Sequence, residues 1–359
     1  MQAERKAKIM SEAEKIHLFD SWLKESARIV ISTHQHPDGD AVGSACGLAC
    51  YLKDRGRTVD VVLPDPAPDT LGFAMDGHIT AFTHSGRQDC EQLISEADLL
   101  ISIDYNRPDR AAELADAIRA SKARKVLIDH HLNPDVNFYD LIFSTSAISS
   151  SCEVLYGILK RLPDIDGNVP AIGAQTLKLL MLGMTTDTNN FANSTYPSTL
   201  QMASELLAAG VDRQEILSGL YNSYRENRFR FMGKYLSDRL TITPYGLAYA
   251  VITTEDLESY DIREGETEGF VNMPLGIAQV RMSIFLRQEG NLFRVSVRSK
   301  QGVSANRCAT MYFNGGGHEN ASGGRLSIPQ DVESAEAARE YIERSCSEFF
   351  SKDELWKSK

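Results

Sequence analysis

The sequence predicts an α/β protein: a mostly parallel sheet flanked by helices, joined by a helical linker to a smaller α+β domain. The main observation is that short apolar or β-branched runs alternate with helical stretches, as in Arg28–Ser32 followed by Asp40–Arg55. Strands that alternate with helices form parallel sheets covered on both faces. A second observation is the length of 359 residues, which exceeds one average domain and suits two.

The first half of the chain supplies this alternation. Ser11–Glu14 has the capping-box form, and the apolar spacing that follows through Trp22 predicts an amphipathic first helix. Gly56 is placed to end the second helix. Further strands are expected at Thr58–Leu63, Leu99–Ile103 and Lys125–Ile128, and further helices at Arg110–Ala120 and from about Ser150 and Ala171.

The sequence changes character after a helical and increasingly charged stretch from Ser198 to about Leu240. The strands that follow are expected to be more antiparallel, because short turns such as Pro244–Gly246 and Glu289–Asn291 join them in pairs. We expect these strands at Leu240–Pro244, Leu247–Ile252, Gln279–Leu286 and Leu292–Arg298, and a last helix near Val332–Phe350. We therefore place a first domain at 1–215, the linker at 216–240 and a second domain at 241–359.

Composition excludes several classes of protein. A hydrophobic fraction of 42% and a charged fraction of 24% are those of a globular protein. No segment approaches the ~20 apolar residues that span a bilayer, and the N-terminus is charged where a signal peptide would be apolar, so we expect a cytoplasmic protein with no membrane partner. The net charge of −11 disfavours a broad grip on long duplex nucleic acid. The six cysteines form no C-x-x-C pair, so we expect reduced, mostly buried thiols.

Acidic residues and histidines follow three of the predicted strands directly. His34–Asp40 comes after the first strand, Asp104 after the strand ending at Ile103, and Asp129–His131 after the strand ending at Ile128. Open α/β sheets bind their ligands at the carboxyl ends of the strands. Each motif alone has an ordinary structural explanation as a turn, a helix cap or a surface histidine, and His36 stays ambiguous. Their recurrence at three strand ends predicts one shared site.

A cluster of carboxylates and imidazoles needs a positive charge to neutralise it, and a divalent metal is the usual solution. Asp38 and Asp40 are separated by one glycine, so they can face two neighbouring ions, and His34 can join Asp38 on the first. Mixed oxygen and nitrogen donors suit manganese, iron, cobalt or zinc better than magnesium or calcium. Asp187, which follows an apolar stretch and two threonines, would alone be read as a cap or turn residue.

These motifs together resemble the four motifs of the DHH phosphoesterase superfamily, which includes the RecJ exonucleases and family II pyrophosphatases. Arg298–Lys300 and Gly315–His318 resemble the signature of the DHH-associated C-terminal domain, which family II pyrophosphatases replace with another domain. The short two-domain form is most similar to the group of bifunctional oligoribonucleases and pAp phosphatases, often called nanoRNases. One departure is Asn189–Phe191, where many relatives carry a glycine-containing sequence, which leaves the shape of this loop open.

The resemblance implies a role for each motif residue. One metal ion would be held by His34, Asp38 and Asp104, and the other by Asp40, Asp104, His130 and Asp187, with Asp104 as the bridge. His131 would face the scissile phosphate, and Asp129 would support the histidine turn. Asp104 and His131 are therefore the expected catalytic residues.

The second domain is expected to hold the substrate. Three consecutive glycines, Gly315, Gly316 and Gly317, expose backbone N–H groups and make an anion-binding nest plausible, while His318 adds a side-chain donor. Arg298, with Ser299 beside it, can hold a phosphate in a bidentate manner, although a lone arginine on a strand is most often a surface residue. Arg110 could reach the phosphate or simply lie on a helix surface.

The expected activity is hydrolysis of short oligoribonucleotides from an end, of 3′-phosphoadenosine 5′-phosphate (pAp), or of both. Two divalent ions, most simply Mn²⁺, would assist a hydroxide that attacks phosphorus in line. The alternatives are a phosphodiesterase for cyclic di-AMP or pApA, an inorganic pyrophosphatase, and a nucleotide-binding module that has lost catalysis. The last alternative would require that a metal ligand be missing. All six positions that the resemblance assigns to metal binding carry the expected ligand residue. A homodimer is a further expectation.

Overall fold

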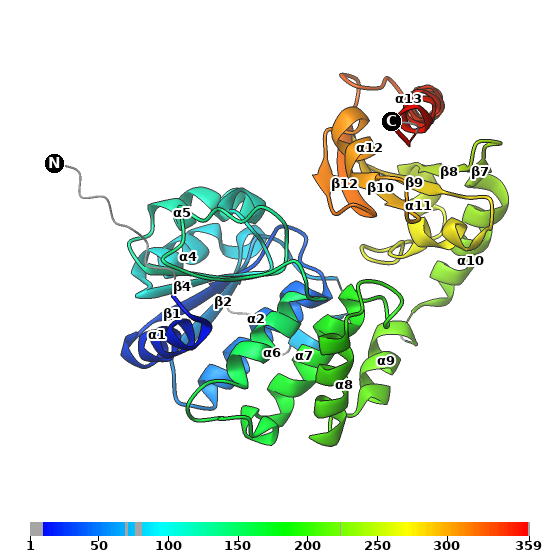
Figure 1. Cartoon of the computed structure of the whole chain (residues 1–359). Coiled ribbons are helices and arrows are strands. Elements are labelled where there is room, and N and C mark those ends of the chain that lie inside the picture. Colours follow the sequence, from blue (N-terminus) through cyan, green and yellow to red (C-terminus); the bar gives the residue numbers. More distant parts are fainter. Residues whose placement is uncertain (1–9, 69–70, 76–80, 223, 358–359) are drawn as a thin grey trace. The chain divides into compact units, whose positions relative to one another are not determined.

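The computed structural model describes residues 10–68, 71–75, 81–222 and 224–357. It divides into two compact units, Met1–Ser223 and Tyr224–Lys359, which are coloured along the chain in Figure 1. Residues 1–9, 223 and 358–359, which fall within the predicted domains and linker, lie outside the described residues. No helix within the described ranges is long and apolar enough to cross a membrane.

The first unit is built on a six-stranded parallel sheet, which confirms the predicted α/β class. The strands run in the order β3-β2-β1-β4-β5-β6. Their bounds are β1 Ile29–Ser32, β2 Val59–Leu63, β3 Ala81–Phe82, β4 Leu99–Ile103, β5 Arg124–Asp129 and β6 Leu141–Ser144. The order reverses direction between β1 and β4, which pair in parallel with Ser32 opposite Ser102. A reversal of this kind opens a crevice at the carboxyl ends of the two strands.

Helices cover both faces of this sheet. Their bounds are α1 Glu12–Glu25, α2 Gly39–Lys53, α3 Gly72–Met75, α4 Thr83–Glu96, α5 Ala115–Ala120, α6 Ser151–Leu159, α7 Ala174–Asp187, α8 Pro197–Ala208 and α9 Arg213–Tyr221. Residues of α1, α2, α6 and α7 pack on one face in a large core with Ile31, Ile101 and Ile128, whereas α4 and α5 pack on the other face with Val30 and Leu100 (Figure 1). The capping box predicted at Ser11 is present at the start of α1.

One predicted helix of the first half is wrong in its form. Instead of a single helix over Arg110–Ala120, a 3₁₀ segment spans Pro108–Leu114 and the α-helix covers only Ala115–Ala120. The change of form coincides with Ala112, whose φ of 46° lies in the left-handed region. The sequence analysis also did not anticipate β3 and β6, which form the two edges of the sheet.

The second unit contains a mixed sheet in the order β11-β12-β10-β9-β8-β7. Its strands are β7 Thr241–Ile242, β8 Leu247–Ile252, β9 Met282–Glu289, β10 Leu292–Ser299, β11 Gly316–Gly317 and β12 Ala321–Ser327. The antiparallel pairing predicted across the two short turns is confirmed for β7–β8 and β9–β10. In contrast, β8 and β9 are parallel, because the chain between them crosses over through α11 Thr254–Glu258 and the 3₁₀ segment Phe270–Gly276.

Two small cores hold this second sheet. The helices α12 Ala305–Tyr312 and α13 Ala335–Lys357 pack on one face through residues such as Cys308 and Phe349. The other face is covered by α10 Glu226–Lys234, α11 and the 3₁₀ segment, with Phe231 and Phe270 in its core. All six cysteines are buried, and no disulfide forms among the described residues, as the sequence predicted.

The region predicted as a linker is shared between the two units. Ile216 and Leu220 of α9 are buried in the core of the first unit. Phe231 of α10 and Tyr235, which begins the π-helical turn Tyr235–Arg239, are buried in the core of the second unit. The domain boundaries drawn from the sequence stay a prediction, but no described helix of this region stands apart from a core.

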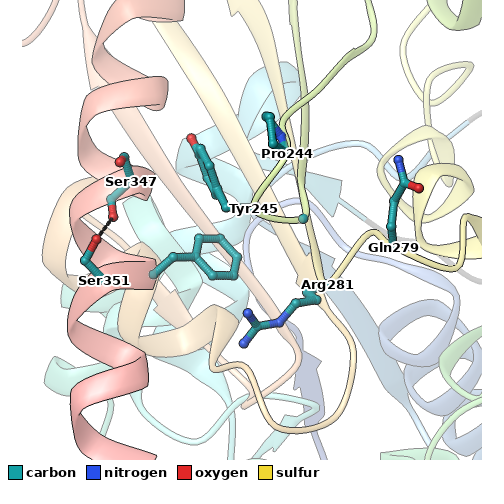
Figure 2. Close-up of a pocket in the computed structure, with 8 residues that line it drawn as sticks. Pro244, Tyr245, Gln279, Arg281, Ser347 and Ser351 are labelled. Carbon is teal, nitrogen blue, oxygen red and sulfur yellow. Dashed lines mark hydrogen bonds between the residues drawn. The ribbon is translucent and has the colours of Figure 1, made fainter.

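The second unit also carries a pocket of about 410 Å³ at the base of β8 and beside α13 (Figure 2). It is lined by Pro244, Tyr245, Gly246, Gln279, Arg281, Ser347, Phe350 and Ser351. The guanidinium carbon of Arg281 lies 5.1 Å from the ring centre of Phe350, and Ser351 Oγ donates to Ser347 O at 2.8 Å. None of the residues predicted to bind substrate lines this pocket.

Glycines allow α2, α6 and α7 to approach one another closely. A Cβ atom at Gly43 would lie 2.6 Å from Leu179 O, and a Cβ at Gly183 would lie 2.3 Å from Cys152 Sγ and 3.0 Å from Asp40 Oδ1. Real Cβ atoms essentially never come so near to other atoms. The absence of a side chain at Gly183 therefore lets the first turns of α2 and α6 meet against α7.

Replacing Gly183 with alanine should destabilise the first unit. The added methyl group would overlap Cys152, and overpacking of this kind costs about 1–3 kcal/mol, so the urea midpoint of the Gly183→Ala variant should fall. Gly157→Ala is the matched control, because Gly157 lies in α6 with nothing within 4 Å of its added Cβ. The control should be neutral or more stable by up to ~1 kcal/mol, since alanine favours helices. Equal midpoints for both variants would contradict the packing argument.

Candidate metal centre

The predicted motif residues of the first unit meet at the carboxyl edge of its sheet. His34 and Asp38 lie in the turn between β1 and α2, Asp104 follows β4 immediately, and Asp129 is the last residue of β5. The strand-end placement expected from the sequence is therefore confirmed. Because β1 and β4 flank the point where the strand order reverses, these side chains share one crevice.

A first group of metal donors consists of His34, Asp38 and Asp104, whose donor atoms all lie within 4.8 Å of one another. His34 Nε2 is 3.4 Å from Asp104 Oδ2 and 3.9 Å from Asp38 Oδ1. The other ring nitrogen, Nδ1, lies 2.8 Å from Gln35 O and donates its proton to that carbonyl. This hydrogen bond leaves the lone pair of Nε2 facing the two carboxylates, which is the tautomer that a metal ligand needs.

A second group consists of Asp40, Asp104 and His130, again within 4.8 Å of one another. His130 Nε2 lies 3.6 Å from Asp104 Oδ1 and 3.9 Å from Asp40 Oδ2. Asp187, the last residue of α7, brings its Oδ2 to 3.7 Å from the same nitrogen. The four residues that the family resemblance assigns to one ion are therefore neighbours in the structure.

Asp104 belongs to both groups, and its two oxygens are divided between them. Oδ2 is the oxygen near His34, whereas Oδ1 is the oxygen near His130. The residue has a φ of 63°, in the left-handed region that is uncommon for residues other than glycine, and its N–H donates to Ile128 O at 3.0 Å. This conformation turns the carboxylate out of β4 and toward both groups.

Burial and mutual repulsion shift the pKa values of these carboxylates upward. Burial, followed by the charge of Asp38, raises the pKa of Asp40 to about 6. Burial and the neighbouring aspartates, Asp40 first, raise the pKa of Asp104 and of Asp187 well above the usual value. Burial lowers the pKa of His34, which therefore stays neutral near pH 7.

Asp38 differs because it caps α2. Desolvation acts to raise its pKa, but His34 and the N–H groups of Ala41 and Asp40 outweigh it and hold the pKa below the usual value. Its Oδ1 accepts from these two N–H groups at 3.1 and 3.0 Å. The helix start thus fixes Asp38 in its ionised form.

These residues fit divalent metal ions. They supply buried carboxylate oxygens and imidazole nitrogens in two adjacent groups, with repelling charges that a cation would neutralise. The mixture of oxygen and nitrogen donors is that of transition-metal sites rather than of calcium sites.

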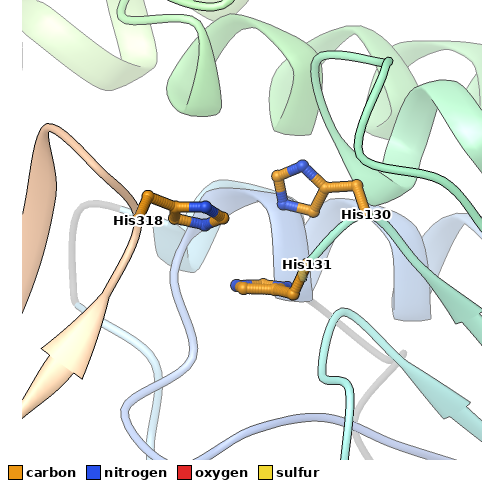
Figure 3. Close-up of side chains that lie close together, drawn as sticks. All are labelled: His130, His131 and His318. Carbon is orange, nitrogen blue, oxygen red and sulfur yellow. The ribbon is translucent and has the colours of Figure 1, made fainter. Parts of the chain in front are cut away.

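Asp129 stabilises the turn that carries His130 and His131. Its Oδ2 accepts from the backbone N–H of His131 at 3.1 Å, and its Oδ1 lies 2.8 Å from His131 Nδ1. The two histidine rings project from the turn after β5 and meet edge to face, with centres 4.7 Å apart (Figure 3). Because Nδ1 donates to a carboxylate, neutral His131 carries its lone pair on Nε2.

The two remaining candidates near this crevice are Arg110 and His36. Arg110 is exposed, its charge helps to lower the pKa of His34, and its carbonyl accepts from Gln35 N at 2.7 Å. This hydrogen bond ties the turn after β1 to the segment after β4. His36 pairs with Asp65 at 3.5 Å and is absent from the donor groups found among the described residues.

In the second unit, Arg298 and Ser299 end β10 with different surroundings. Arg298 is half-buried, donates from Nη1 to Val297 O and Ser322 O at 3.0 and 3.2 Å, and has its pKa lowered by burial. Ser299 is buried, and its hydroxyl donates to Val303 O at 2.6 Å while accepting from Asn320 at 3.0 Å. These contacts commit the Ser299 hydroxyl to the fold of its own turn.

The glycine loop before His318 is shaped by close packing against β12. A Cβ at Gly315 would lie 1.9 Å from Gly323 O, and one at Gly317 would lie 2.8 Å from Ala321 O, whereas one at Gly316 would make an ordinary contact of 3.9 Å with Thr310 Oγ1. The N–H groups of Gly315 and His318 donate to Ala309 O and Ala321 O. Two of the three glycines are therefore required by the packing of the second unit itself. His318, at the end of this loop, is half-buried (Figure 3).

The loop that departs from the family pattern keeps a conformation suited to glycine. Asn189, Asn190 and Phe191 have φ values of 46°, 57° and 69°. Asparagine tolerates this left-handed region better than most residues, so it can stand where a relative carries glycine. The departure therefore changes the residue types but not the need for a left-handed turn after Asp187.

The segment that enters α6 also contacts this site, although its residues were not predicted to do so. Ser151 and Cys152 contact Asp40 and Asp104, although no metal-ligand pattern marks them. The only signal in the sequence is a run of three serines before a glutamate, which reads simply as the start of a helix.

The parallel sheet with its two adjacent groups of aspartates and histidines defines an α/β protein with side chains that could hold divalent ions. The chain belongs to the DHH family: residues 28–184 match the DHH family N-terminal domain, and residues 245–348 match the DHHA1 domain. The resemblance read from the motifs is thereby confirmed.

Three relatives illustrate this membership. The bifunctional oligoribonuclease and PAP phosphatase NrnA of Thermus thermophilus is 31% identical over 343 residues, covering 92% of this chain and 96% of the relative. The crystal structure of an exopolyphosphatase-related protein from Bacteroides fragilis is 33% identical, with a TM-score of 0.88, and covers 97% of this chain and 99% of that one. The cyclic-di-AMP phosphodiesterase GdpP of Geobacillus thermodenitrificans is 24% identical, covering 91% of this chain but 49% of the relative.

The raised pKa of Asp40 predicts how the metal-free protein responds to pH. A carboxyl whose pKa rises on folding binds more protons in the folded state, so its contribution to stability falls as the pH rises from 3.8 to about 6. Asp40→Asn removes this loss. The variant should therefore gain stability relative to wild type between pH 4.5 and pH 7, by at least about 2 kcal/mol, because it also relieves the repulsion that raises the pKa values of Asp104 and Asp187.

Urea unfolding in the presence of a chelator measures this difference. The hydrogen bonds that asparagine disturbs add an offset that does not depend on pH, and the opposing protonation of His34 is shared by both proteins. Only the change of the difference with pH tests the assignment. A difference that is constant, or that shrinks as the pH rises, would contradict it.

Proposed function

We propose that the protein is a metal-dependent phosphoesterase that hydrolyses short oligoribonucleotides from an end, and pAp. The observation that carries the proposal is the position of Asp104, whose two oxygens face His34 on one side and His130 on the other. Such an arrangement suits a carboxylate that bridges two ions. The 31% identity with an oligoribonuclease and PAP phosphatase over nearly the whole chain supports the choice of substrates.

His34, Asp38 and Asp104 would hold one ion, and Asp40, Asp104, His130 and Asp187 the other, with Mn²⁺ as the proposed metal. Two divalent ions, when bound, supply the Lewis acidity that activates water and stabilises the charged transition state. The half-buried Asp187 and the exposed Asp38 line the open side of the crevice, and the deeply buried Asp40 and Asp104 form its floor.

His131 is the residue that would donate a proton to the substrate. Its Nδ1–H is held by Asp129, so Nε2 presents either a lone pair or a proton to the substrate. A protonated Nε2 would neutralise a nonbridging oxygen of the phosphate and could pass its proton to the leaving group. Arg110 offers an exposed guanidinium near His34 for a further phosphate oxygen. In the second unit, Arg298 and His318 are the proposed contacts for the remainder of the nucleotide.

A phosphodiesterase for cyclic di-AMP or pApA is the second candidate function. It would use the same metal centre, but the relative with this activity in its name is 24% identical, and this chain covers only 49% of it. Short oligoribonucleotides and pAp are therefore the preferred substrates. A cytoplasmic location and a homodimer stay predictions.

The direct test is a side-by-side assay of purified protein with Mn²⁺ on short RNA, pAp, pApA, cyclic di-AMP and pyrophosphate. We expect the highest kcat/KM for short RNA and pAp. A chelator should abolish this activity, and added Mn²⁺ should restore it. Activity that survives exhaustive chelation would contradict the metal-dependent mechanism.

Asp104→Ala should leave less than about a tenth of wild-type turnover on every substrate, because it removes the carboxylate shared by both groups of donors. A tenfold loss corresponds to about 1.4 kcal/mol in the activation barrier. Asp116→Ala is the matched control, since the Asp116 side chain is 95% exposed on α5 and belongs to neither group. An Asp104→Ala protein that is folded and keeps more activity than this would show that the bridging assignment is wrong.

Arg298→Ala should weaken nucleotide hydrolysis by about tenfold to a hundredfold in kcat/KM and leave the bound metal unchanged, because a charge-assisted contact to phosphate contributes roughly 1.5–3 kcal/mol. Bis-p-nitrophenyl phosphate offers no second phosphate or base to grip, so its hydrolysis should suffer much less. Arg294→Ala is the control on the same strand, where the arginine pairs with Glu264 instead.

The ratio between the two kinds of substrate decides this prediction. Equal losses on nucleotide and artificial ester would place Arg298 in the chemical step, and loss of metal would place it in the metal centre. His318→Ala provides an independent second variant with the same expected pattern.

A further inference from the structure

The start of α6 contacts the metal centre at three points. Both oxygens of Asp40 accept backbone N–H groups from it: Oδ2 from Ser151 at 2.7 Å and Oδ1 from Cys152 at 3.0 Å. The Ser151 hydroxyl donates to Asp104 Oδ1 at 2.9 Å. A single residue, Ser151, thus holds two of the proposed ligands, one through its backbone and one through its side chain.

Ser151 contacts Asp104 Oδ1, which is the oxygen that faces the second group of donors. Asp104 Oδ1 faces His130, while Oδ2 faces His34. A hydrogen bond to Oδ1 fixes the rotation of the carboxylate and therefore keeps one oxygen on each side. Without it, the carboxylate could turn about its last side-chain bond, and the two groups would lose their shared member.

Burial makes this hydrogen bond difficult to replace. Ser151 is fully buried, and Asp40 and Asp104 are 1% and 2% exposed. Two carboxylates held this close repel one another, and donors directed at their oxygens favour the charged form that a metal requires. The N–H groups at the first turn of a helix carry partial positive charge and add to the same effect.

The hydroxyl of Ser151 is not needed to begin the helix. Ser150 is the N-cap, with its Oγ accepting from Glu153 N at 3.1 Å. Ser149 donates its hydroxyl to the carboxylate of Glu153, which Thr199 also contacts at 2.7 Å. The three consecutive serines therefore have different roles. Ser149 and Ser150 stabilise the start of α6, and Ser151 contacts the candidate metal donors.

We propose that Ser151 is a positioning residue for metal binding, which orients Asp104 through its hydroxyl and Asp40 through its N–H. This inference rests on the proposed function, because it assumes that these aspartates hold divalent ions. It adds that the affinity for the ions depends on a residue that touches neither the ions nor the substrate.

Calorimetric titration of Mn²⁺ into the metal-free, full-length protein tests the inference without any substrate. Ser151→Ala removes the hydroxyl and keeps the backbone N–H. We expect it to bind at least one ion about tenfold to a hundredfold more weakly than wild type, as outer partners of metal ligands commonly contribute. Ser149→Ala is the matched control, since it removes a buried hydroxyl from the same segment that contacts neither Asp40 nor Asp104. Its Mn²⁺ affinity should equal that of wild type even if its thermal midpoint falls.

Circular dichroism establishes that each variant is folded before titration. If Ser151→Ala does not fold, Ser151→Cys takes its place under the same criterion, because a thiol fills the space but donates only weakly. Wild-type affinity in the Ser151 variant would overturn the inference alone, as would equal losses in the Ser149 and Ser151 variants. A wild-type protein that binds no Mn²⁺ would instead overturn the proposed function and the inference together.

Discussion

Repulsion among the aspartates at the carboxyl edge of the first sheet is the constraint on which the rest of this unit depends. Asp40 and Asp104 are almost completely buried, and their raised pKa values measure how poorly the protein alone tolerates their charges. A buried charge without a partner is costly, so such a cluster persists only where donors or cations compensate it. The amides at the starts of α2 and α6 supply part of that compensation. The proposed ions supply the remainder.

The helices are arranged to bring these donors within reach. At Gly183, Cys152 of α6 and Asp40 of α2 occupy the space that a Cβ would need, and at Gly39 a Cβ would come within 2.4 Å of Thr186. The same contacts place Asp187, at the end of α7, beside His130. The same close packing of α2, α6 and α7 therefore also positions the candidate metal donors.

In the second unit, by contrast, the polar residues mainly stabilise the fold of that unit. Gly315 and Gly317 are required by their nearness to β12, and the Ser299 hydroxyl secures a turn. Arg298 keeps a desolvated guanidinium that, among the described residues, is hydrogen-bonded to two carbonyls, an arrangement that favours an incoming anion. The glycine loop thus shapes the surface near the strand end, while Arg298 and His318 are the groups proposed to contact a nucleotide.

The sequence by itself determined the α/β class, the positions of most strands and the candidate metal donors that the structure brings together. Each of these predictions rests on local patterns, such as an apolar run followed at once by Asp104 or by Asp129–His131. Because the carboxyl ends of parallel strands all lie at one edge of the sheet, the residues that follow these strands meet there. Tertiary structure alone decided the left-handed turn at Asp104, the parallel pairing of β8 with β9 and the role of Ser151. The contact of Ser151 with Asp40 joins residues 111 positions apart. A serine at a helix start reads the same locally whether it caps the helix or reaches a carboxylate, because the difference lies in which distant element packs against it.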